Sequence, residues 1–232
     1  MTYDELSAAI QIYTENQFPD TYLADGSVVT APEQIALFVE QAEQRIYNSV
    51  QFPSLRKNVI GNVSSTNKYL SAPDDYLATY SLAVIDEAGA YEYLLNKDVN
   101  FIRQAYPNPT TDVGIPKYYA LFGPTVTGGL ITNELSFILG PTPDLSYTVE
   151  LHYYYYPESI VTAGTTWLGD NFDTVLLYGS LVEAYTYMKG EQDMLALYDT
   201  KYKEALALAK RLGDGMERQD AYRSGQFRQA VT

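Results

Sequence analysis

The spacing of apolar side chains along this chain changes twice. Within residues 1–50 they recur every three or four positions, which predicts amphipathic helices. Residues 57–156 alternate apolar and polar side chains or form short apolar runs broken by Gly and Pro, which predicts strands. Residues 170–212 return to the helical spacing. We therefore predict an α+β fold: a bundle of N- and C-terminal helices with an inserted, mainly antiparallel β domain.

N-capping residues predict where the first two helices begin. Thr2 with Glu5, and Thr30 with Glu33, each have the spacing of a capping box. The predicted helices cover residues 2–14, 30–50, 170–189 and 193–212. The predicted domains are a helical domain (1–56 and 157–215), a β domain (57–156) and a C-terminal arm (216–232).

Within the β domain, turn residues separate the apolar runs. They predict two hairpins (59–63 with 68–70, and 81–85 with 90–95), a short helix (98–106) and three further strands (117–122, 135–139 and 145–156). In the last strand the odd positions from Tyr147 to Tyr155 are apolar, whereas the even positions mix polar and aromatic side chains. This strand is expected to have a core on one side and a wet surface or a partner on the other. Tyr118, Tyr154 and Tyr156 are the candidate interface residues of the β domain.

The C-terminal stretch from Met216 to Thr232 shows no apolar period, and Gly213 and Gly215 predict that the last helix ends before it. One interpretation is a frayed tail. The other is an arm that is mobile alone and orders on a partner, because arginine and aromatic side chains are common anchors. The candidate anchors are Arg218, Tyr222, Arg223, Phe227 and Arg228.

Composition narrows the function classes. The 232 residues include 15 Lys and Arg but 29 Asp and Glu, a net charge of −14 that opposes nonspecific binding to duplex DNA. There is no cysteine, which excludes disulfides and thiolate chemistry. The N-terminus lacks a basic signal-peptide region, and no apolar run is long enough to cross a membrane. The 23 tyrosines suit strands and protein interfaces.

The residues predict no catalytic or metal site and no cofactor. His152 is the single histidine and lies in a strand, where a structural or surface role is far more common than a catalytic one. The acidic pairs Asp74-Asp75 and Asp86-Glu87 are typical of solvated turns. The glycine-rich stretch 123–129 lacks the Gly-Lys-Ser/Thr ending of a phosphate loop, so we interpret it as a hairpin loop.

A series of short motifs, taken in order along nearly the full chain, resembles the head-to-tail connector (adaptor) proteins of tailed bacteriophages, especially those of short-tailed phages (podoviruses). The motifs are Gln51-Phe52-Pro53-Ser54-Leu55-Arg56, Tyr69-Leu70-Ser71-Ala72-Pro73-Asp74-Asp75-Tyr76, Gly114-Ile115-Pro116-Lys117-Tyr118-Tyr119, Leu139-Gly140-Pro141-Thr142-Pro143-Asp144 and the strand from Tyr147 to Tyr156 with Pro157 after it.

This resemblance implies a virion protein of the neck between capsid and tail, made in the host cytoplasm. It implies a closed ring of about twelve copies, whose subunits meet through heterologous interfaces. The implied partners are the portal protein, the nozzle or hub proteins of the tail, and further copies of the chain. DNA would pass through without specific binding, and no membrane is involved. The resemblance also assigns the C-terminal arm to the portal.

Two other classes stay open at this point. A carbohydrate- or receptor-binding tail module would show a sugar-sized aromatic pocket and would usually form trimers. A hydrolase would need two carboxylates that converge in a cleft.

Overall fold

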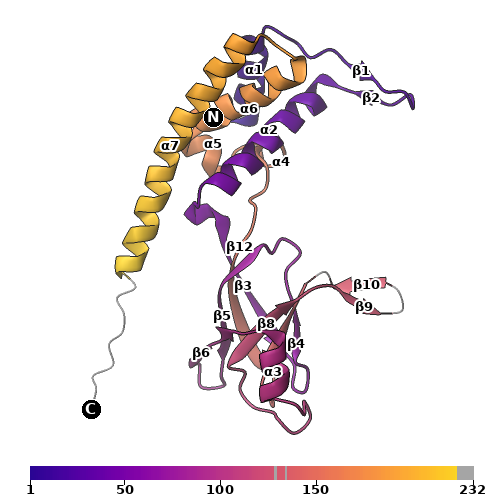
Figure 1. Cartoon of the computed structure of the whole chain (residues 1–232), viewed down its shortest axis with the longest axis vertical. Helices are drawn as coiled ribbons and strands as arrows, with labels where there is room; N and C mark the ends of the chain where they lie inside the picture. Colours follow the sequence, from indigo (N-terminus) through magenta and orange to yellow (C-terminus); the bar gives the residue numbers. More distant parts are fainter. Residues whose placement is uncertain (128–129, 134, 224–232) are drawn as a thin grey trace. The chain divides into compact units, whose positions relative to one another are not determined.

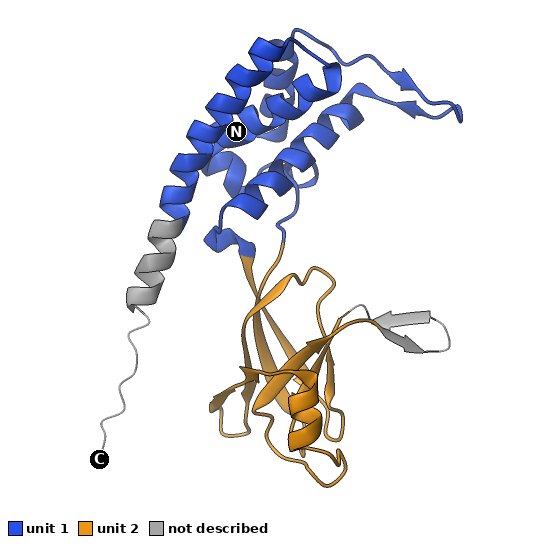
Figure 2. Cartoon of the chain, viewed as in Figure 1, with its two compact units in different colours: residues 1–55, 156–232 blue, residues 56–155 orange. Residues whose placement is uncertain are grey.

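A computed structural model describes residues 1–127, 130–133 and 135–223 of the chain, and the side chains of residues 1–124 and 135–213 (Figure 1). The chain forms two compact units, shown in Figure 2. We call residues 1–55 with 156–232 the helical unit and residues 56–155 the β unit. The architecture is α+β, and helices from both ends of the chain pack together, as the change of apolar spacing predicts.

Six helices and two short strands make up the described part of the helical unit, besides one 3-10 turn. They are α1 (Tyr3–Thr14), β1 (Thr21–Tyr22), β2 (Val28–Val29), α2 (Ala31–Ser49), the turn η1 (Pro53–Leu55), α4 (Ile160–Ala163), α5 (Trp167–Asn171), α6 (Asp173–Met188) and α7 (Gln192–Arg223). Helix α6 packs against α1, α2, α5 and α7. Both capping boxes are confirmed: the backbone N–H of Thr2 donates to Glu5 at 2.9 Å, and that of Thr30 donates to Glu33 at 2.7 Å.

Close packing around α6 depends on a glycine. A Cβ atom on Gly179 would lie 3.3 Å from the Cβ of Ala42 on α2 and 3.3 Å from the ring of Tyr202 on α7. Gly179 therefore lets three helices approach one another. Around this contact the core is filled by fully buried aliphatic side chains, among them Leu6, Ile10, Ile35, Val39, Ile46 and Leu176.

Two predicted helix limits are wrong. The helix expected from Asp170 is divided between α5 and α6, because Phe172 leaves the helical backbone region and its ring packs 5.2 Å from that of Phe52. Helix α7 does not end at Gly213 but continues to Arg223. A Cβ atom on Gly213 would lie 3.0 Å from the carbonyl oxygen of Gln51, so this glycine serves a close approach within the helical unit rather than a helix end.

The β unit is built around two four-stranded sheets. Its elements are β3 (Arg56–Val63), β4 (Tyr69–Ser71), β5 (Ala78–Ile85), β6 (Tyr91–Tyr93), β7 (Leu95–Asn96), α3 (Val99–Ala105), β8 (Tyr118–Phe122), β9 (Thr125–Thr127), β10 (Leu130–Asn133), β11 (Ser136–Gly140) and β12 (Tyr147–Tyr154). The strand orders are β3-β12-β5-β6 and β4-β11-β8-β7, and β9 pairs with β10 as a separate ribbon. All neighbours are antiparallel except β7 and β8.

One of the two predicted hairpins is wrong. Strands β5 and β6 pair as expected, but β3 and β4 do not pair with each other: β3 joins β12 and β4 joins β11, in different sheets. The long strand β12 offers eight paired positions to β3, many more than the three residues of β4 could. The short helix after Asp98 and the three later strands are confirmed.

The core of the β unit lies between the two sheets and is rich in aromatic rings. Phe137 is fully buried, with ring centroids 5.4 Å from Tyr76 and 5.8 Å from Tyr119. The alternation predicted for β12 is confirmed: Tyr147, Val149, Leu151 and Tyr153 are buried, and the residues between them are half-buried. The outer face of this sheet is thus left for contacts with solvent or a partner.

Candidate interaction surfaces

The outer face of the sheet β3-β12-β5-β6 combines exposed apolar side chains with a polar centre. The strand register sets Ile60, Glu150, Ala83 and Tyr93 side by side across the four strands. At the two ends of this row, Ile60 and Tyr93 are each 65% exposed, and Tyr91 lies next to Tyr93 with ring centroids 6.2 Å apart. Large apolar groups therefore sit at both edges of one sheet.

Glu150 organises the polar centre of this face. Its Oε1 accepts a hydrogen bond of 2.7 Å from the side chain of Asn58 and lies 3.8 Å from Nε2 of His152. The negative charge of Glu150, with a hydrogen bond to it, raises the pKa of Tyr91. The other ring nitrogen of His152 lies 3.2 Å from the hydroxyl of Ser81. His152 thus makes one hydrogen bond, to Ser81, and lies beside Glu150 on the half-buried face of the strand.

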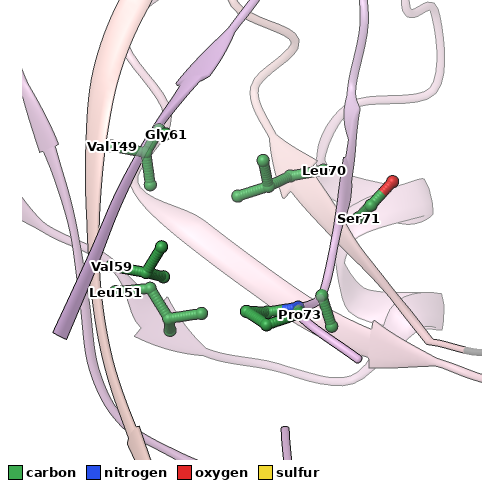
Figure 3. A pocket seen from close by; sticks show the side chains of 8 residues that line it. Val59, Gly61, Leu70, Ser71, Pro73, Val149 and Leu151 are labelled. Atoms are coloured by element: carbon green, nitrogen blue, oxygen red, sulfur yellow. The ribbon is translucent and has the colours of Figure 1, made fainter. Parts of the chain in front are cut away.

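An apolar cavity of about 270 Å³ opens between the edges of the two sheets (Figure 3). It is lined by Val59, Gly61, Val149 and Leu151 on one side and by Leu70, Ser71 and Pro73 on the other, and Ala72 lines it as well. None of these eight residues is aromatic, whereas the carbohydrate-binding alternative expects a sugar-sized aromatic pocket. The cavity therefore does not support the carbohydrate-binding alternative.

The three tyrosines predicted as an interface lie in separate aromatic clusters. Tyr118 on β8 packs edge-on against Phe101, with ring centroids 5.4 Å apart. The ring of Tyr154 on β12 packs against Tyr80. Tyr156 belongs to the helical unit, where its hydroxyl donates to the side chain of Asn48. Within the β unit, Tyr118 and Tyr154 belong to different sheets, β4-β11-β8-β7 and β3-β12-β5-β6.

The sequence pattern does not single out the exposed residues of β6. The sequence pattern that predicts this strand is short: Tyr91 and Tyr93 alternate with Glu92 over three residues after the turn at Gly89. A three-residue alternation also occurs in ordinary loops, so it carries little weight until the pairing of β6 with β5 is known.

The helical unit exposes apolar side chains of its own. Tyr22 is 77% exposed on the ribbon formed by β1 and β2, Ile12 is 73% exposed on α1 and Leu208 is 64% exposed on α7. The same unit buries a carboxylate, Glu43, whose Oε1 accepts from the backbone N–H of Ile160 at 3.0 Å. Burial raises the pKa of Glu43, although hydrogen bonds with the Ser159 side chain and the Ile160 backbone act to lower it.

The C-terminal anchors fall largely outside what the structure describes. Arg218, Tyr222 and Arg223 lie on the last turns of α7, but their side chains are outside the described residues. Phe227 and Arg228 lie outside the described residues altogether.

The acidic pairs hold local structure rather than converge in a cleft. Asp75 accepts hydrogen bonds of 2.7 Å from Lys57 and from the hydroxyl of Tyr153, and Asp86 accepts one of 2.8 Å from the backbone N–H of Ala90. Among the described residues no three His, Cys, Asp or Glu side chains gather as a metal site. In the same part of the chain, no helix has both the length and the apolar character to cross a membrane.

The described residues of this α+β chain present exposed sheet edges and exposed apolar side chains, which are surfaces suited to contacts with other proteins. Comparison with protein families makes the class specific: the model of the SU10 adaptor protein matches residues 1–229. The chain therefore belongs to the SU10 adaptor protein family, a structural family of phage head-to-tail adaptors. No curated protein sequence matches the chain.

Proposed function

We propose that this adaptor forms a closed ring of about twelve copies in the virion neck, between the portal and the tail of a short-tailed phage. The match to the adaptor family over residues 1–229 carries this proposal. The ring joins the portal protein to the nozzle or hub proteins of the tail, and its lumen forms part of the conduit through which DNA leaves the capsid.

The charge of the chain supports a role as a conduit. A net charge of −14 per copy makes the ring strongly acidic. Duplex DNA is held nonspecifically by cations that neutralise its phosphates. An acidic lumen therefore lets DNA pass without trapping it.

The C-terminal segment is the proposed portal contact, with Arg218, Tyr222, Arg223, Phe227 and Arg228 as anchors. Residues 216–223 continue helix α7. A portal site would thus meet preformed helix over these residues, which avoids an ordering cost of roughly 1–2 kcal/mol per residue. The β unit, with Tyr118 and Tyr154, is the proposed contact for the tail.

Electron microscopy of portal-bearing capsids incubated with the purified protein tests this function. We expect a single ring below the portal, and its copy number follows from its rotational symmetry. A protein that leaves these capsids bare, or that binds them without a ring, would contradict the proposal.

Two truncations locate the portal contact. A chain that ends at Gly215 loses all five anchors and is expected to keep its fold but to leave the capsids unoccupied. A chain that ends at Arg223 keeps three anchors and serves as the matched control, with intermediate binding expected. If the chain ending at Gly215 binds as well as the full chain, the C-terminal contact is wrong, whereas the ring itself is unaffected.

A further inference from the structure

Strands β3 and β6 are the two edges of one four-stranded sheet. In the part of the chain that the structure describes, β3 pairs only with β12 and β6 pairs only with β5. All three residues of β6 are exposed, as are residues 57–60 of β3. An exposed edge is a template for another strand, and many proteins cover or block it.

The directions of the two edges fit each other. Each neighbouring pair in this sheet is antiparallel, so β3 and β6 run in opposite directions. If β6 of one copy lies beside β3 of the next, the new pair is antiparallel too and the pattern continues unbroken. The contact joins two different edges, so it is heterologous, the kind that generates rings.

The exposed side chains of the two edges also match. The register sets Ile60, Tyr91 and Tyr93 on the outer face of the sheet. With Tyr91 opposite Ile60 of the next copy, these three large apolar groups, which are 49–65% exposed in the single chain, would cover one another. The same register brings Glu92 opposite Val59, one of the residues that line the apolar cavity.

Charge favours pairing of β6 with β3 over pairing of two β6 strands. Glu92 and Lys57 both lie on the inner face, opposite Val84 and Tyr153. Two β6 strands paired about their centres would set Glu92 against Glu92, which is unfavourable. On β3, Glu92 instead has Lys57 as a diagonal neighbour; the Lys57 side chain is 47% exposed although it also pairs with Asp75.

The dimensions agree with a ring around DNA. Strands lie about 4.8 Å apart, so each copy of a continuous four-stranded sheet would advance about 19 Å. Twelve copies give a circumference of about 230 Å and a diameter of about 73 Å, estimated from that strand spacing. Such a ring leaves a wide lumen inside the sheet.

We propose that β6 of one copy adds to β3 of the next, so that the sheets β3-β12-β5-β6 of neighbouring copies form one continuous sheet around the ring. The inference rests on the proposed ring and specifies the surface through which its copies meet. The partner is a second copy of this chain.

Because the chain has no cysteine, paired cysteines test this contact directly. A full chain with Ile60→Cys and Tyr91→Cys is assembled on portal-bearing capsids, treated with a short bifunctional maleimide and separated on a denaturing gel. We expect a ladder that extends beyond the dimer. Each single variant, and the control pair Ile60→Cys with Phe122→Cys, is expected to stay monomeric. Thermal unfolding of the unassembled variants verifies that each is folded.

The outcomes separate the two proposals. A ring seen by electron microscopy without a ladder overturns the continuous sheet and leaves the ring intact. Dimers from Ile60→Cys alone show pairing of two β3 strands and also overturn it. Failure to form any ring on the portal refutes the proposed function and this inference with it.

A charge variant tests the role of Glu92. In the paired-cysteine background, Glu92→Lys is expected to slow ladder formation about threefold, given the size of cross-strand charge effects. Glu87→Lys makes the same charge change outside the strand and is expected to have no such effect. Equal slowing by both variants would contradict the proposed pairing of Glu92 with β3.

Discussion

The two units of this protein leave different kinds of surface open. Apart from the ribbon β1-β2, the helical unit is built from helices, whose backbone hydrogen bonds close within each helix away from its ends, so its exposed groups are mainly side chains such as Ile12 and Leu208. In the β unit the sheet β3-β12-β5-β6 ends at β3 and β6, and these edge strands expose backbone donors and acceptors as well as side chains. Contacts through helices therefore depend on individual side chains, whereas contacts through sheet edges tolerate substitution but require register.

Their cores differ as well. The core of the β unit brings the rings of Tyr76, Tyr119 and Phe137 together between two sheets. The core of the helical unit also buries aromatic rings, among them Phe18 and Phe52, and it depends in addition on close approach at Gly179. A substitution that removes a buried ring is thus expected to destabilise either unit, whereas added volume at Gly179 is expected to destabilise the helical unit.

The largest effect is expected from Phe137→Ala. This substitution removes a fully buried ring, and such changes cost about 3–5 kcal/mol of the free energy of unfolding. Phe122→Ala on β8 is the control, since Phe122 is 53% exposed. Urea unfolding followed by near-ultraviolet and far-ultraviolet circular dichroism checks the result. If the helical signal falls together with the β signal in the parent and in the variant, the two units unfold as one.

The next effect tests the helical unit. Gly179→Leu places a large side chain where a Cβ already lies 3.3 Å from Ala42 and Tyr202, and overpacking of this kind costs about 1–3 kcal/mol. Thr186→Leu adds a leucine at an exposed position of the same helix and is expected to cost much less. Urea unfolding measures both. A Gly179→Leu variant as stable as the control would show that α6 has room to move.

The sequence predicted the parts of this fold that local chemistry determines. The capping boxes at Thr2 and Thr30 depend on residues three positions apart, and the alternation along β12 depends on one strand. The partner of β3 could not be predicted, because many strands offer a similar apolar face. The prediction that the last helix ends at Gly213 was wrong for a related reason. The tendency of glycine to end a helix is overridden here by close packing against Gln51, and no local sequence pattern reveals that contact.

The candidate sites also divide into features that the local sequence predicts and features that depend on strand pairing. The outer face of β12 could be predicted as a wet or partner-facing surface, because it mixes Glu150 and His152 with aromatic residues. The edge at β6 could not, since Tyr91 and Tyr93 become an edge only once β6 pairs with β5.

A smaller effect is expected at the start of α1. The hydroxyl of Thr2 accepts a hydrogen bond from the backbone N–H of Glu5 at 3.3 Å, and loss of such a cap costs about 1 kcal/mol. Thr2→Ala is therefore expected to lower the free energy of unfolding by about that amount, and Thr2→Ser, which keeps the hydroxyl, is expected to restore most of it. Urea titration compares the three chains. Equal loss in both variants would show that the methyl group of Thr2, not its hydroxyl, stabilises the helical unit.

The last effect is expected from Glu43→Gln, and its size depends on pH. Burial raises the pKa of Glu43 above its ordinary value of 4.5, so the folded state holds this proton more tightly than the unfolded state. The resulting stabilisation is fully present below pH 4.5 and is lost as the pH rises through the raised pKa.

Glutamine stays neutral at all these pH values, and its side-chain oxygen still accepts from the backbone N–H of Ile160. The stability of the Glu43→Gln variant relative to the parent is therefore expected to grow as the pH rises above 4.5. Urea unfolding at a series of pH values measures this difference, with a change at Glu15, an exposed glutamate just after α1, to glutamine (Glu15→Gln) as the control. A difference that shrinks with rising pH would mean that the folded protein stabilises the charged form of Glu43. The helical unit would then contain a buried charge that its fold stabilises. The comparison of the two units would have to include this charge as well as their exposed surfaces.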